Sequence, residues 1–101
     1  MFNFNNPNGY SGFGTESTNV IVSFDTLQKA RQDLIGEIQA VIEYDAHIHS
    51  SIDKPAVATW TNIKNEELVH VGELLALLNY LDPTQRQHVQ KGFAEFMERL
   101  K

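Results

Sequence analysis

Residues 60–77 read WTNIKNEELVHVGELLAL, and their apolar positions recur at steps of three and four. This period predicts an amphipathic helix with one face toward a core. The stripe passes through positions 60, 63, 67, 70, 74 and 77, but two of these hold Glu67 and His70. Burying a charged group without a partner costs several kcal/mol or shifts its pKa. A metal ion is the partner that suits a carboxylate and an imidazole together.

A second regular stripe precedes this one in the sequence. Positions 27, 30, 34, 37, 41, 44 and 48 are apolar except for Glu37 and Tyr44. The segment Asp25–Gln28 has the form of a capping box, with a polar residue and a glutamine three residues later. The pattern therefore predicts a first helix from about Phe24 to Ser50, whose core-facing stripe again carries a carboxylate.

The segment Ser50–Pro55 interrupts the helical pattern. Asp53 or Lys54 is the expected N-cap of a second helix that runs to about Tyr80, with the proline tolerated in its first turn. A short connection between two long helices predicts an antiparallel hairpin. Asp82 then supplies a new N-cap, and a shorter third helix follows to the C-terminus. The expected fold is all-α, with residues 24–101 as one helical domain.

This hairpin exposes more apolar surface than one chain can cover. A chain of ~80 residues without its N-terminal segment is near the size at which a lone core becomes marginal. We therefore expect a homodimer in which two hairpins make a four-helix bundle.

Composition limits the classes of partner and the cellular compartment that we expect. The chain has 13 Asp and Glu against 8 Lys and Arg, with a net charge of −5, which disfavours nucleic acid or an anionic membrane as partner. It has no cysteine, which excludes disulfides and Cys-ligated metals. No apolar run approaches the ~18 residues of a membrane span. We expect a cytoplasmic protein.

The first 23 residues lack any helical or strand period. They are rich in Asn and Gly with scattered aromatics, and Pro7-Asn8-Gly9 is typical of a turn. We expect residues 1–23 to form a flexible N-terminal arm. A docking segment for a partner's groove is the alternative.

The two interrupted stripes meet in the expected hairpin. Glu37 lies ~15 residues before the turn, and Glu67 and His70 lie ~14 to 17 residues after it, so the three should be level. Bundles with di-iron or di-manganese centres take one Glu from each of two helices and Glu-x-x-His from the other two. One chain supplies half of this set. The sulfur-free donors suit iron or manganese, with zinc as a competitor.

These residues resemble the encapsulated ferritin family of the ferritin-like superfamily. The resemblance rests on Glu37, Tyr44 and the run from Asn65 to His70, and covers roughly residues 30–80. It implies a di-iron ferroxidase centre formed between two protomers, assembly into a ring such as a decamer, and an encapsulin shell protein as partner. The corresponding ligands are Glu37, Glu67 and His70, with Tyr44 beside them.

The chain also departs from the family. At the outer positions through which ions enter the family's centre, this chain has Gly36, Gln39 and Glu43, of which only Glu43 is acidic. Glu43 is therefore the one candidate for an outer metal site.

The resulting hypothesis is a ferroxidase that oxidises Fe(II) to Fe(III) for iron storage or detoxification, as cargo inside an encapsulin nanocompartment. Two alternatives stay open. One is a rubrerythrin-like or di-manganese peroxidase or catalase. The other is a metal-free helical scaffold, in which the polar residues only fix the register of the helices.

Overall fold

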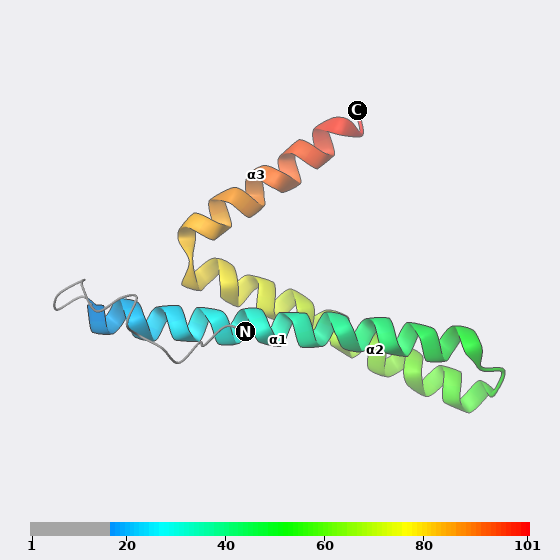
Figure 1. Ribbon diagram of the computed structural model, residues 1–101. Coiled ribbons are helices and arrows are strands. Elements are labelled where there is room, and N and C mark those ends of the chain that lie inside the picture. The colour runs from blue at the N-terminus through cyan, green and yellow to red at the C-terminus, as the bar shows by residue number, and fades with distance from the viewer. Residues whose placement is uncertain (1–16) are drawn as a thin grey trace. The chain divides into compact units, whose positions relative to one another are not determined.

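The computed structural model describes the backbone from Ser17 and the side chains from Phe24 to the C-terminus. The described residues form three helices and no strand: α1 (Ser17–Ser50), α2 (Lys54–Leu81) and α3 (Pro83–Arg99) (Figure 1). The expected all-α fold is confirmed. Residues 1–16, most of the expected N-terminal arm, lie outside the described part.

The chain divides into two compact units. Ala30–Ala76 forms one unit, which holds most of α1, the turn and most of α2. The other unit contains the segments before Ala30 and after Ala76. We describe each by itself.

Within the unit 30–76, α1 and α2 form the expected antiparallel hairpin, side by side (Figure 1). Contacts between side chains show the direction. Glu37 contacts His70, and Asp45 contacts Lys64. The residue number on α2 falls as the number on α1 rises, as antiparallel packing requires.

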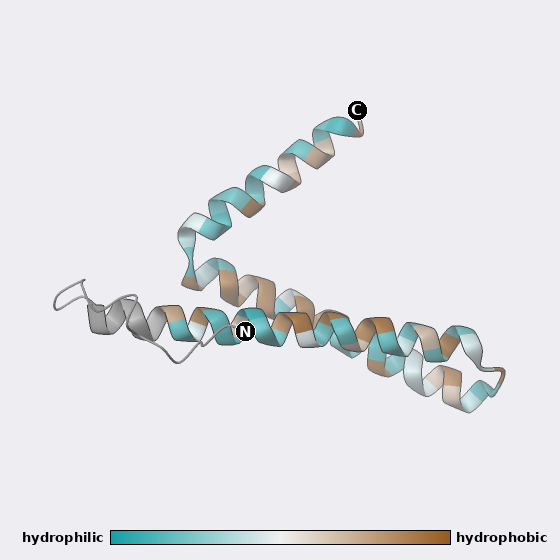
Figure 2. Cartoon of the chain, viewed as in Figure 1, coloured by the Kyte–Doolittle hydropathy of each residue, from teal (hydrophilic) through white to brown (hydrophobic). Residues whose placement is uncertain are grey.

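The predicted stripe of α1 is confirmed. Its seven positions are all buried or partly covered: Leu27, Ala30, Leu34, Glu37, Val41, Tyr44 and Ile48. Figure 2 shows hydrophobic segments recurring along both long helices.

The predicted stripe of α2 is correct only in part. Positions 60, 63, 67 and 74 are partly covered, but His70 and Leu77 are exposed, and their neighbours Val71 and Leu78 are covered instead. Residues three and four apart lie on either side of one line along a helix. On α2 the covered residues are therefore Val71 and Leu78, four positions after Glu67 and Leu74, rather than the residues three positions after them. The side of α2 that carries His70 is exposed.

Caps explain where the helices begin. The Asp53 side chain accepts a hydrogen bond from the Ala56 N–H at 2.9 Å, which confirms it as the N-cap of α2. Asp82 caps α3 in the same way, accepting from the Gln85 N–H at 3.1 Å.

The start of α1 differs from the expectation. The helix begins at Ser17 rather than near Phe24, so the segment Asp25–Gln28 lies inside it and the predicted capping box is wrong. Asp25 instead forms an ion pair with Lys29, 3.0 Å away and one turn further along. A polar residue with a glutamine three positions later has the same spacing in a cap and in a helix interior.

Among the residues of the other unit whose side chains are described, one apolar residue is well buried: Leu78, which is 2% exposed. Most large apolar side chains of α3 are exposed, namely Phe93, Phe96 and Met97, and so is that of Leu100, which follows the helix. No described helix is long and apolar enough to cross a membrane.

We expect Asp53→Ala to lower the free energy of unfolding by about 1 kcal/mol, because the first-turn N–H groups of α2 lose their acceptor. Urea unfolding at one fixed protein concentration measures this change. Asp53→Ser is the control, since a hydroxyl also accepts at the N-cap and should retain most of the stability. Equal losses in both variants would contradict the capping role.

Candidate metal centre

The candidate centre lies midway along the hairpin. Glu37 comes from the stripe of α1. Glu67 and His70 are three residues apart on α2, so their side chains lie on one face of that helix. All three predicted ligands belong to the same compact unit, and the antiparallel register places them at one height.

The three side chains meet closely. Each offers one ligand atom, and these atoms all lie within 4.8 Å of one another. His70 Nδ1 is 3.3 Å from an oxygen of Glu37 and 3.2 Å from an oxygen of Glu67. His70 Nδ1 therefore contacts a carboxylate from each helix. The spacing in the sequence predicted that these three residues lie at one height.

The hairpin covers the centre only in part. The side chains of Glu37 and Glu67 are 25% and 20% exposed, while that of His70 is 48% exposed. No polar or charged side chain among the described residues is fully buried. Burial within one chain therefore does not force a metal into this site, which differs from the expectation based on the stripes alone.

The two carboxylates raise the pKa of His70 above its ordinary value of 6.5. The main cause is the hydrogen bond to Glu37, with further attraction from the charges of Glu37 and Glu67, and desolvation opposes the change. A proton on Nδ1 is thus stabilised at the place where the three ligand atoms converge.

The donor set fits a first-row divalent ion. Metal–nitrogen and metal–oxygen bonds of about 2.1 Å put neighbouring ligand atoms about 3.0 Å apart in an octahedral shell and about 3.4 Å apart in a tetrahedral one. The separations at His70 Nδ1, 3.2 and 3.3 Å, fall between these values. These two separations are compatible with binding of one ion by His70 together with either carboxylate.

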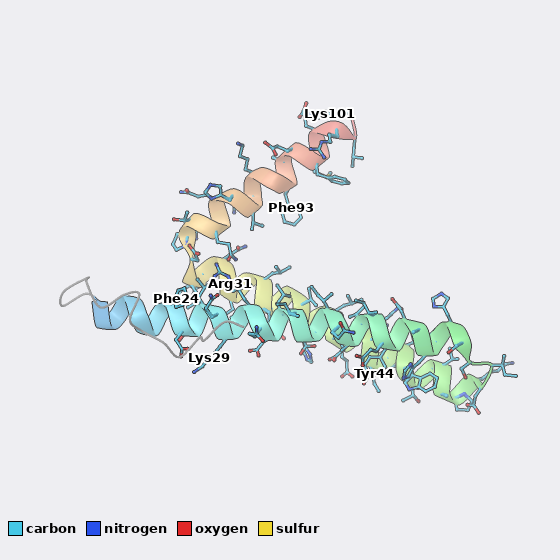
Figure 3. The ribbon with its side chains drawn as sticks, in the orientation of Figure 1. Phe24, Lys29, Arg31, Tyr44, Phe93 and Lys101 are labelled. Carbon is cyan, nitrogen blue, oxygen red and sulfur yellow. The ribbon has the colours of Figure 1, made fainter. Side chains whose placement is uncertain are left out.

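The outer residues make other contacts. Figure 3 labels Tyr44 on α1, and its ring meets that of His47 edge-on, with centroids 6.2 Å apart. No hydrogen bond joins Tyr44 to the three ligands in the described part of the chain, so its role beside the centre stays a prediction. Glu43 accepts a hydrogen bond from the Gln39 amide at 3.3 Å on the exposed surface. Its role as an outer metal site also stays a prediction.

Two contacts across the hairpin were not predicted. Lys64 forms an ion pair with Asp45 at 3.0 Å, and the His47 ring meets Trp60 with centroids 5.0 Å apart. His47 and Trp60 lie at similar distances from the turn, so the height argument that aligned Glu37 with Glu67 and His70 could have found this contact. Lys64 lies about one helical turn further from the turn than Asp45 does, so that argument would not have paired these two residues.

Comparison with known proteins finds one distant relative to report. The chain is 32% identical over 74 residues to a "ferritin-like-encapsulin shell fusion protein" of Pyrococcus furiosus. The match covers 73% of this chain but 21% of the relative. No protein-family model matches the chain, and no solved structure matches it. The similarity thus links the chain to one part of a protein whose name joins ferritin-like and encapsulin.

The site predicts a pH dependence. His70 has a raised pKa in the folded chain, so its ion pairs stabilise the fold fully below about pH 6.5, and the contribution disappears as the pH rises through the folded pKa. Following the His70 ring protons by NMR in metal-free protein should give a midpoint above 6.5. Glu37→Gln should lower that midpoint, since the largest cause is removed. An unchanged midpoint would rule out the hydrogen bond as the cause.

Proposed function

We propose that this chain is a ferritin-like ferroxidase whose substrate is Fe(II). The observation that carries the proposal is the convergence of Glu37, Glu67 and His70 from two helices, with ligand atoms within 4.8 Å. The named relative supports the same class of protein. Such a centre oxidises two Fe(II) ions to Fe(III), and the two electrons reduce dioxygen to hydrogen peroxide with uptake of two protons.

The charges suit two ions shared by two chains. One chain brings the carboxylates of Glu37 and Glu67, and two chains bring four negative charges, which balance two divalent cations. Each chain also supplies one neutral imidazole. We propose that two protomers meet across the open flank of His70 and complete the centre in a four-helix arrangement. A higher ring and an encapsulin shell as partner belong to the same proposal and rest on the resemblance and on the relative's name.

The residues have separate tasks in this proposal. The carboxylates of Glu37 and Glu67 attract and neutralise the cations and fix their positions. His70 must lose the proton on Nδ1 before that nitrogen can bind an ion, so uptake of metal releases a proton. The partial exposure of the three side chains leaves a path for Fe(II) and for the oxidant.

The test compares two neighbouring glutamates. Removing a residue that only hydrogen-bonds a metal ligand typically weakens metal binding at least about tenfold. Glu67→Ala and His70→Ala remove proposed ligands themselves, so each should weaken Fe(II) binding by at least this factor. Both should also abolish oxidation of Fe(II) under air. Glu66→Ala is the matched control, because Glu66 is exposed and outside the cluster. Spectroscopic titration and the rate of Fe(III) formation measure both effects. Equal losses at Glu66 and Glu67 would refute the site.

A metal-free scaffold is the second candidate. One observation favours it: the hydrogen bonds from His70 satisfy both carboxylates without any ion. In that case the three residues only hold α1 and α2 in register.

Thermal unfolding with and without metal separates the two candidates. An ion that binds only the folded chain stabilises it by about 2.7 kcal/mol at one hundred times its dissociation constant. A domain of this size should then show a melting temperature at least about 10 °C higher. Fe(II) under argon, Mn(II) and Zn(II) are the ions to compare, with Glu67→Ala as control. Identical melting curves for all of them would favour the scaffold.

A further inference from the structure

Two lines of residues along α2 compete for the contact with α1. Each line has three members spaced by seven residues, so their side chains lie along one edge of the helix. The first line consists of Ile63, His70 and Leu77. The second line consists of Lys64, Val71 and Leu78. In the structure every member of the second line is covered at least in part, whereas on the first line His70 and Leu77 are exposed and only Ile63 is partly covered.

The apolar members do not decide between the two lines. Each line has two apolar members and one basic member. An isoleucine and a leucine on the first line differ from a valine and a leucine on the second by a single methylene group, so covering either pair removes a similar apolar surface from water. The choice between the two rotations of α2 therefore depends on the basic members, His70 and Lys64.

Lys64 meets an opposite charge on α1 in the observed rotation. Its ammonium nitrogen lies 3.0 Å from Asp45 Oδ1, and its side chain is 25% exposed, against 45% for that of Asp45. Side chains on a helix lean toward the N-terminus of that helix. Those of α2 therefore lean toward the turn and those of α1 lean away from it, so Lys64 and Asp45 lean toward each other although Lys64 starts further from the turn.

A partly exposed ion pair contributes little to the total stability of a fold, but a small preference suffices where two rotations are closely matched. Few contacts oppose it, because among the described side chains of the unit 30–76 only Ala30 is almost fully covered. His70 does not favour the other rotation, since from the exposed side its Nδ1 already reaches Glu37 and Glu67. The ion pair is thus the contact that distinguishes the two rotations.

We propose that the ion pair between Asp45 and Lys64 sets the rotation of α2 and thereby keeps His70 on the open flank of the hairpin. Asp45 and Lys64 are positioning residues, because neither belongs to the cluster of candidate ligands and both act through the orientation of His70. The consequence for iron rests on the proposed function, in which a second chain completes the centre across that flank. The rotation itself needs no metal.

Reversal of one charge tests the rotation in the full, metal-free chain. Lys64→Glu places two carboxylates opposite each other, so α2 should turn and cover His70 in place of Val71. A neutral gadolinium chelate in solution measures this, because it speeds the NMR relaxation of accessible protons. The His70 ring should lose most of this relaxation, while the Val71 methyl groups should gain it. Opposite changes at adjacent residues distinguish a rotation from loosened packing, which would increase both signals and overturn the proposal.

Two further variants complete this test. Adding Asp45→Lys to Lys64→Glu restores an ion pair with its charges exchanged, and should return both relaxation effects toward those of the wild-type chain. Lys54→Glu is the matched control, because it makes the same change of charge at an exposed position of α2 and should alter neither effect. Unchanged relaxation in Lys64→Glu, an equal change in Lys54→Glu, or a double variant that stays like Lys64→Glu would overturn the proposal.

Metal binding separates this inference from the proposed function. Lys64→Glu should weaken binding of Fe(II) under argon by about tenfold or more, as loss of a residue that positions metal ligands typically does. Simple attraction by the added carboxylate would instead strengthen binding, so the sign of the change identifies its cause. Affinity that is equal to or greater than that of the wild-type chain would overturn the positioning role. A wild-type chain that binds no Fe(II) would refute the ferroxidase, while the NMR measurement would still test the rotation.

Discussion

The antiparallel register of α1 against α2 is the constraint on which the rest depends. Glu37 lies 33 residues before His70 in the sequence, and only this register puts it beside Glu67 and His70. The same register produces the ion pair between Asp45 and Lys64. A shift of α2 by one residue would turn every side chain by about 100° and separate the donors. The packing of the two helices and the site therefore require the same register.

The candidate centre is a hydrogen-bonded cluster that favours a proton on His70. The hydrogen bond to the Glu37 carboxylate and the charges of Glu37 and Glu67 raise the pKa of His70 above its ordinary value. The same carboxylates are the donors that an ion needs. The distances from Nδ1 to both oxygens lie in the range of neighbouring ligands around one ion. The cluster is therefore a hydrogen-bonded group whose side chains are also of the types that bind metal ions.

The hairpin has two chemically different flanks. One carries the open side of His70 and the acidic donors, where the meeting of two chains would bring negative charges together. The other exposes three isoleucines at helical spacing on α1, Ile35, Ile38 and Ile42. Few side chains are buried within a single chain: among those described, only Ala30 and Leu78 are almost fully covered.

The sequence by itself determined the helices, their antiparallel pairing and the convergence of Glu37, Glu67 and His70, because period, caps and distance from a turn are local quantities. The stripe of α1 and the caps at Asp53 and Asp82 followed in the same way. Only the tertiary structure decided on which side of its stripe α2 is covered. Val71 and Leu78 are covered while His70 is open, since residues at i+3 and i+4 fit a helical period equally well. The sequence also did not reveal the start of α1, because Asp25 and Gln28 have the spacing of a capping box although they lie inside the helix, where Asp25 pairs with Lys29.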